Sequence, residues 1–194
     1  MRKNPLVSRR DGYLVPNSFS NLWFHGSEDP YEEEPRDAFL PSGVHGGSYD
    51  ATFFTSSESF AREFAEGFWD SDDNGFVYAC RIKDVKLFDI DNIFQNMSDP
   101  NSLLTEEGMR FRDHLSYHTS LPGDAERALA SLRSVEWDSF NEENNPYYYD
   151  IMATMDTLGY RGWVEIEAGH RNVALLHPDE DVEIMWSYRA GEKL

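Results

Sequence analysis

The chain has 194 residues, of which 40% are hydrophobic, which is enough for one well-buried core and short for two, so we expect a single domain over residues 1–194. Its 36 acidic and 17 basic side chains give a net charge of -19, which disfavours a nucleic-acid partner and favours a protein with a basic surface. The single cysteine, Cys80, excludes an internal disulfide framework and a cysteine-based zinc site, and it fits a reducing cytosol.

The sequence carries no signal for export or for membrane insertion. Basic residues occur at Arg2, Lys3, Arg9 and Arg10, but no apolar stretch of signal-peptide length follows them. No window approaches the length of a membrane span. These features predict a cytoplasmic protein that does not associate with membranes.

The N-terminal part predicts one strand among loops. Residues 1–20 mix charges, proline and serine with little periodicity, so we expect an arm that lies over the domain. Residues 22–25 read as a strand, and residues 28–41, with three consecutive glutamates and three prolines, read as a solvated loop. Three glycines over 43–47 predict a glycine-rich loop that brings the chain back to the domain and in which the backbone can approach a ligand closely.

The next segment predicts a strand, a helix and more strands. Residues 51–55 form the strand, and Ser56 or Ser57 can cap a helix that has Phe64 on its apolar face. Residues 75–83 are β-rich and long enough for a central strand, and residues 87–90 predict a further short strand.

A helical insertion is predicted over residues 100–158, because the apolar period there changes toward 3.6. The expected helices cover residues 103–117, 124–135 and 147–158. Three strands are expected after them, over residues 163–167, 172–176 and 182–187. Gly159 should end the last helix. His114 and His118 have helical spacing but lack a neighbouring glutamate and a third ligand, so we expect no metal site.

The order of these motifs resembles a known family. The run Leu-Trp-Phe-His-Gly-Ser over 22–27, a glycine-rich loop, a strand ending in Phe-Phe-Thr and an aromatic helix resemble the NAD-binding half of the ADP-ribosyltransferase fold. The similarity is to its histidine-type branch, that of diphtheria toxin and the poly(ADP-ribose) polymerases. The resemblance implies an α+β fold in which two short antiparallel sheets surround an NAD cleft, with the helical insertion covering one side.

The resemblance also implies how NAD would be bound. His25, at a strand end where it should pack little apolar area, would bind a ribose, and Gly26 would hold the nicotinamide amide. Phe64 takes the place of a tyrosine that stacks on nicotinamide, and a phenylalanine ring can do the same. The remaining expected contacts are Phe53 on the other side of the ring, and Ser27 or Thr55 in place of a family serine that is Ala61 here.

The catalytic acid has two candidates. Aligned with the family, Asn172 takes the strand-start position of the polymerase glutamate, where we expect it to contact NAD, and the absence of an acid at this position means that chain elongation is not expected. Glu165 and Glu167 alternate on one face of a strand, in a Val-Glu-x-Glu run that resembles small phage-encoded ADP-ribosyltransferases directed against bacterial defence complexes. Glu167 is the first choice and Glu165 the second, with His25 completing the catalytic set.

The function implied by the resemblance is mono-ADP-ribosyl transfer from NAD to a partner protein, as in a phage or toxin effector. One alternative is a catalytically silent module of the same fold that uses its acidic surface to bind a basic partner. A third reading is a toxin that only hydrolyses NAD or that modifies nucleic acid.

Overall fold

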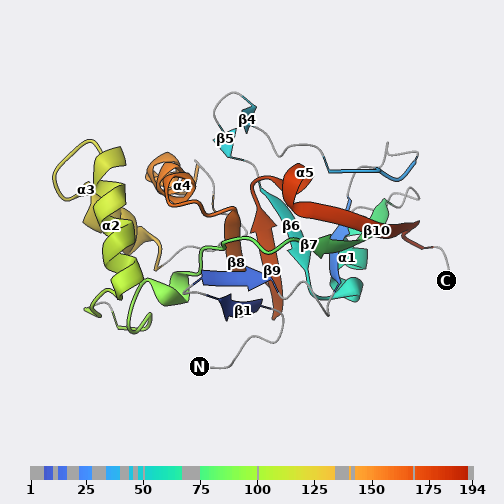
Figure 1. The fold of residues 1–194 in the computed structure, drawn as a ribbon, viewed down its shortest axis with the longest axis horizontal. Coiled ribbons are helices and arrows are strands. Elements are labelled where there is room, and N and C mark those ends of the chain that lie inside the picture. The colour runs from blue at the N-terminus through green and yellow to red at the C-terminus, as the bar shows by residue number, and fades with distance from the viewer. Residues whose placement is uncertain are drawn as a thin grey trace.

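Figure 1 shows the fold in a computed structural model. It describes residues 7–10, 13–16, 22–27, 34–39, 44–45, 48–49, 51–66, 75–99, 101–133, 140, 143–167 and 169–191. Only the backbone is described for residues 7–10, 13–16, 44–45, 48–49 and 165–167.

One six-stranded antiparallel sheet organises the molecule, in the strand order β10-β7-β3-β6-β9-β8. Its strands are β3 (Trp23–Gly26), β6 (Thr52–Thr55), β7 (Phe76–Ile82), β8 (Gly162–Glu167), β9 (His170–Leu175) and β10 (Val182–Arg189). Two separate hairpins pair β1 (Val7–Arg10) with β2 (Tyr13–Pro16) and β4 (Val44–His45) with β5 (Ser48–Tyr49). The α+β class is as predicted.

The predicted pair of short sheets is wrong, because the strands join into one. The junction between β3 and β6 is nevertheless narrow, since Phe24 and Thr55 are its single register pair. The other junctions of the sheet have between four and seven register pairs. The sheet therefore consists of two three-stranded halves that meet at a seam one residue pair long.

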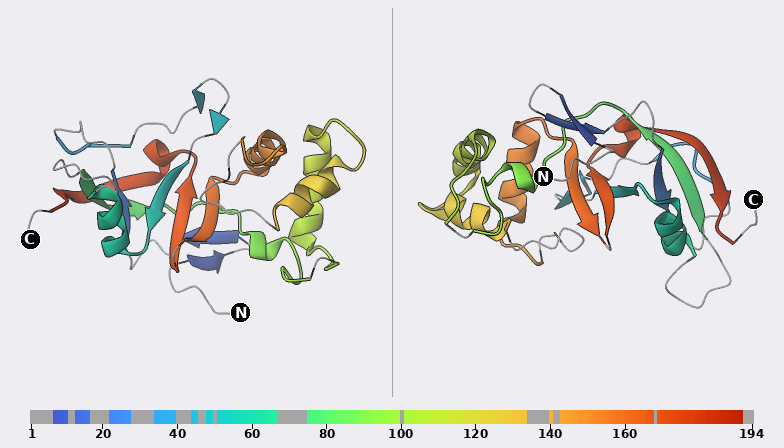
Figure 2. Two further views of the ribbon diagram at one scale, coloured as in Figure 1. Left: turned by 180° about the vertical axis from the view of Figure 1, so that it is seen from behind. Right: turned by 90° about the horizontal axis from the view of Figure 1, so that it is seen from below.

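The helices lie in two places. Helix α1 (Glu58–Ala65) packs against β3, β6 and β7. Figure 2 shows that α2 (Glu106–His118), α3 (Asp124–Ser131) and α4 (Tyr148–Thr157) gather at the opposite end of the molecule, beyond β8. A short helix, α5 (Pro178–Asp181), precedes β10. No helix in the described segments combines the length and the hydropathy needed to cross a bilayer.

Local sequence explains where these helices begin and end. The Ser57 side chain accepts a hydrogen bond from the Phe60 amide at 3.2 Å, and Thr105 does the same for Gly108 at 3.0 Å, so both act as N-caps. Gly159 follows α4 with a φ of 74°, in the left-handed region that favours glycine. The helices expected over 103–117 and 147–158 are confirmed, with shifts of one to three residues at their ends. The helix expected over 124–135 is confirmed only as Asp124–Ser131, since residues 132–133 form a turn and residues 134–135 lie outside the described segments.

Two hairpins appear where loops were expected. The arm over residues 1–20 contains β1 and β2, and Asp11-Gly12 stands between the paired Arg10 and Tyr13. The segment over 43–47 contributes to β4 and β5, with Gly46-Gly47 between the paired His45 and Ser48. Asp-Gly and Gly-Gly are both dipeptides that favour two-residue hairpin turns, a local signal that hydrophobic periodicity does not contain.

The strand expected over 87–90 is also wrong. Phe88 forms a single parallel bridge to Trp163, with its amide donating to the Gly162 carbonyl at 2.8 Å. Asp89 then caps a 3-10 turn over Ile90–Asn92 through a hydrogen bond from the Asp91 amide, so strand pairing cannot continue.

The two faces of the sheet bury different cores. One face carries an aromatic and aliphatic cluster that spans both halves, with Trp23 and Tyr78 from one half and Phe54 and Val173 from the other. On the opposite face, α1 covers β7 with small residues, and the helices α2, α3 and α4 pack on Trp163 and Ala174. Helix α1 also contacts β6, so it packs on both strands of the seam.

Cys80 is inside the core, and this position predicts its reactivity. Its side chain is 0% exposed, and burial raises the pKa of the thiol to about 12. Because the thiolate is the reactive form, we expect no modification by iodoacetamide at pH 8 in the native protein and rapid modification in denaturant. Mass spectrometry of the single labelled site measures this, and fast labelling of the native protein would contradict the burial.

Candidate functional site

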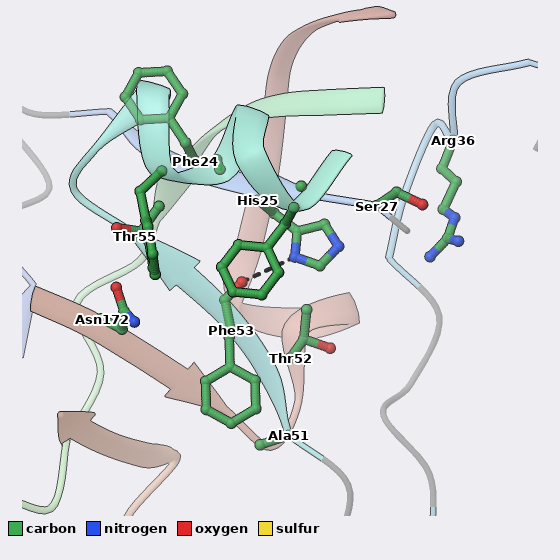
Figure 3. Close-up of a pocket in the computed structure, with 13 residues that line it drawn as sticks. Phe24, His25, Ser27, Arg36, Ala51, Thr52, Phe53, Thr55 and Asn172 are labelled. Atoms are coloured by element: carbon green, nitrogen blue, oxygen red, sulfur yellow. Dashed lines mark hydrogen bonds between the residues drawn. The ribbon is translucent and has the colours of Figure 1, made fainter. Parts of the chain in front are cut away.

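A pocket of about 470 Å³ opens at the seam of the sheet, within the range of about 300–1,000 Å³ that is usual for small-molecule sites. Its walls come from β3, β6, α1, the start of β9 and the segment over 34–39 (Figure 3). The lining residues are Phe24, His25, Gly26, Ser27, Arg36, Ala51, Thr52, Phe53, Thr55, Phe60, Ala61, Phe64 and Asn172.

The residues expected to bind NAD meet in this pocket. All seven are among its lining residues, namely His25, Gly26, Ser27, Phe53, Thr55, Phe64 and Asn172. Sequence reasoning missed Phe24, Arg36 and Thr52, and it assigned Phe60 to ordinary packing although Phe60 also lines the pocket. Alternation along β3 would have indicated Phe24, which lies two residues before Gly26, but Thr52 alternates with the core residue Phe54, and no sequence motif marks Thr52 or Arg36.

His25 is held in one orientation. Its Nδ1 lies 2.9 Å from the carbonyl oxygen of Phe53, the contact drawn as a dashed line in Figure 3. Because a carbonyl oxygen can only accept, Nδ1 carries the hydrogen in this arrangement. The ring centroid lies 5.1 Å from that of Phe39, 5.6 Å from that of Phe54 and 6.1 Å from that of Tyr78. The expectation that His25 packs little apolar area is therefore wrong.

These contacts define the expected effect of His25→Ala. We expect a loss of about 1 kcal/mol in the free energy of unfolding, since three ring contacts are removed from a half-buried side chain. NAD affinity should fall by about ten-fold, the typical value of one hydrogen bond in a desolvated site. Urea unfolding and calorimetric titration separate the two effects, and unchanged NAD affinity would make His25 purely structural.

Gly26 allows α1 to approach the sheet. A Cβ at position 26 would lie 2.0 Å from the carbonyl oxygen of Ala61 and 3.0 Å from the Cβ of Phe64. No real side chain tolerates the first distance, so the helix could not pack here against any other residue. The missing Cβ thus serves the packing of α1, which in turn places Ala61 and Phe64 in the wall of the pocket.

A row of register partners runs across four neighbouring strands, β3, β6, β9 and β8, at the seam. Phe24 pairs with Thr55, Thr55 pairs with Asn172, and Asn172 pairs with Glu165. Thr55 and Asn172 are buried, at 5% and 2% exposure, and the Thr55 hydroxyl accepts from the Ser57 amide at 3.2 Å. This end of the pocket therefore offers buried hydroxyl and amide groups beside the rings of Phe24 and Phe64.

The two candidate acids are placed only by their backbones. Glu165 is the register partner of Asn172, and Glu167 is the partner of His170 at the turn end of the β8–β9 hairpin. The ring of His170 stacks on that of Phe60, with centroids 4.7 Å apart and planes at 26°. The turn end of the hairpin, which carries the backbone of Glu167, is thus connected to the pocket wall through the stack of His170 on Phe60. The side chains of both glutamates lie outside the described part of the chain.

The two helical histidines have other contacts. His118 Nε2 lies 3.2 Å from the Thr157 hydroxyl, and the His114 ring packs edge-on to Tyr117 with centroids 6.2 Å apart. Among the described residues, no group of three or more His, Cys, Asp or Glu side chains is arranged to hold a metal ion.

Comparison with known proteins returned no match among protein-family models, curated proteins or solved structures. What the pocket binds must therefore be inferred from its residues and its geometry.

Phe64 provides a test of ring stacking. It is half-buried, and its ring is edge-on to that of Phe60 with centroids 5.0 Å apart, so the position of its own ring is constrained. Phe64→Tyr should leave NAD affinity almost unchanged, and Phe64→Ala should weaken it by roughly 0.5 to 1.5 kcal/mol. Calorimetric titration of both variants checks this. Loss of binding in the tyrosine variant, with the fold retained, would show that the ring is not a stacking surface.

Proposed function

We propose that the protein binds NAD in the seam pocket and transfers its ADP-ribose group to a partner protein. One observation carries the proposal: seven residues that the motif resemblance assigns to NAD come from separate segments of the chain and line one pocket. Three of them come from β3 and the residue after it, two from β6, and one each from α1 and β9.

The pocket chemistry is suited to the nicotinamide end of NAD. Phe64 and Phe53 offer ring faces and edges for a flat heterocycle, and Thr55 and Asn172 offer polar groups for its amide. His25 would contact a ribose hydroxyl. In the reaction, the bond between the nicotinamide nitrogen and the ribose carbon breaks, nicotinamide leaves with the bonding electrons, and a nucleophile of the acceptor bonds to that carbon.

The proposed acid acts on charge that develops at the ribose. As nicotinamide leaves, the ribose acquires oxocarbenium character, which a nearby carboxylate stabilises. Glu167 is assigned to this role and Glu165 is the second choice. The acceptor is expected to have a basic surface, because the protein carries a net charge of -19.

A second candidate function is a catalytically silent binding module. None of the described residues that line the pocket carries a carboxylate. The motif resemblance aligns Asn172 with the polymerase glutamate, although Asn172 is the third residue of β9 (His170–Leu175) and not the first, as the alignment expects. A protein without a catalytic acid would bind NAD, or a basic partner, without breaking the glycosidic bond.

One experiment separates these functions. The purified protein is incubated with NAD labelled in its adenylate part, with and without cell extract, and free nicotinamide and protein-bound label are both measured. We expect nicotinamide release together with label on an extract protein. Binding without release would indicate the silent module, release without protein label would indicate hydrolysis or another acceptor, and absence of both binding and release would refute the proposal.

A further inference from the structure

The pocket has a second, cationic end. Arg36 is the one lysine or arginine among the described residues that line it, and no described lining residue is acidic. The chain as a whole has a net charge of -19, so a pocket wall whose described residues include one arginine and no acidic side chain differs in sign from the rest of the protein. The geometry points to Arg36 as the residue that binds the phosphate groups of a nucleotide in this pocket, an inference that rests on the proposed function and extends it.

The short segment that carries Arg36 is fixed at two points. The Arg36 amide donates to the hydroxyl of Tyr78 at 3.0 Å, and Tyr78 is 0% exposed. Three residues later, the ring of Phe39 packs edge-on to those of His25 and Phe54, with centroids 5.1 Å away in both cases. This anchoring fixes the backbone of Arg36 beside His25 and lowers the entropy lost when the side chain binds a ligand.

Burial along the segment distinguishes Arg36 from its neighbours. Arg36 is half-buried and Phe39 is buried, whereas Glu34 and Asp37 are exposed. The acidic side chains on either side of Arg36 thus face solvent to a greater extent than Arg36 does. The simple interpretation of Arg36 as one more residue of a solvated acidic loop does not account for this pattern.

The order of groups along the pocket matches that of a dinucleotide. In Figure 3, Arg36 and Ser27 lie on one side of His25, and Thr55 and Asn172 lie on the other. A ligand with its aromatic amide beside Thr55 and a ribose at His25 would direct its next group, the diphosphate, toward Arg36 and Ser27. Guanidinium groups bind phosphate oxygens through two parallel hydrogen bonds, and a serine hydroxyl can donate a third.

The test uses ADP-ribose, which contains the diphosphate but no nicotinamide. Its affinity is measured by calorimetry for the unchanged protein and for the variants Arg36→Gln and Arg36→Lys. We expect the glutamine variant to bind ADP-ribose at least about ten-fold more weakly, the effect of losing a hydrogen bond to a charged group, with a smaller loss for lysine. Arg112→Gln is the matched control, because Arg112 lies on α2 and pairs with Asp113 at 2.7 Å.

Two results would overturn the inference. One is equal affinity of the unchanged protein and Arg36→Gln for ADP-ribose, and the other is no binding of ADP-ribose by the unchanged protein. The thermal midpoint of each variant shows whether it has a folding defect. If Arg36→Gln has one, the ADP-ribose affinity of Arg36→Lys is compared with that of the unchanged protein instead. Failure of the proposed function is a separate result, namely absence of nicotinamide release from NAD, and it can occur whether or not ADP-ribose binds through Arg36.

Discussion

Replacing Glu167 with glutamine should reduce ADP-ribose transfer by roughly two to three orders of magnitude and leave NAD affinity within about a few-fold of its original value. Glutamine keeps the shape and hydrogen bonding of the side chain and removes its charge. In the proposed reaction that charge would act only as the glycosidic bond lengthens, so turnover should fall without a matching loss of binding. Single-turnover transfer and calorimetric titration provide the two measurements.

Glu165→Gln is the internal control, because Glu165 occupies the same strand two residues earlier and is the register partner of Asn172. If its variant loses activity and the Glu167 variant does not, the roles of the two acids are reversed. If both variants retain the original rate, the catalytic acid lies elsewhere or the reaction requires none.

Replacing Gly26 with alanine should destabilise the protein by about 3 kcal/mol, at the upper end of the usual cost of overpacking. The added methyl would lie 2.0 Å from the Ala61 carbonyl oxygen, which is backbone and cannot rotate away. To admit the methyl, α1 must move off β3, and this motion displaces Phe64 from the pocket wall. We therefore expect loss of NAD binding even in the fraction that remains folded, measured by urea unfolding and by titration well below the unfolding midpoint.

Gly108→Ala is a matched control for Gly26→Ala. A Cβ at position 108 would lie 2.1 Å from the Ile93 carbonyl oxygen, so the crowding is similar, but Gly108 lies on α2 and not on the pocket. Its variant should lose stability and retain NAD affinity. Equal loss of affinity in both variants would show that the effect at Gly26 is a general consequence of instability.

Local signals in the sequence were sufficient for most of the elements. Ser57 acts as the expected cap of α1 and Gly159 follows α4 as expected, so these two helix ends were readable from single residues, whereas the helix expected from 103 begins only after Thr105, whose capping role was not predicted. The hairpins around Asp11-Gly12 and Gly46-Gly47 were missed because each strand is too short to show a period, and only the turn dipeptide marks them. The joining of β3 to β6 depends on one residue pair, which no local pattern encodes.

The pocket was predictable only where a motif covered it. His25, Gly26 and Phe64 belong to runs whose order is informative, and all three line the pocket. Arg36 stands in an acidic, proline-containing stretch whose composition indicates a solvated loop, and its position depends on the distant Tyr78. Contacts between residues so far apart in sequence arise from the tertiary fold, and propensity or spacing cannot reveal them.

The one-pair seam leaves the two halves of the sheet weakly coupled through the backbone. Phe24 and Thr55 form the single register pair between β3 and β6. Side chains supply further ties: His25 Nδ1 donates to the Phe53 carbonyl at 2.9 Å, and the Phe39 ring packs on Phe54 from one half and on Tyr78 from the other, with centroid distances of 5.1 and 5.6 Å. Helix α1 contacts both β3 and β6. Residues that line the pocket, His25 among them, therefore also hold the two halves together, so a substitution there changes the sheet as well as the site.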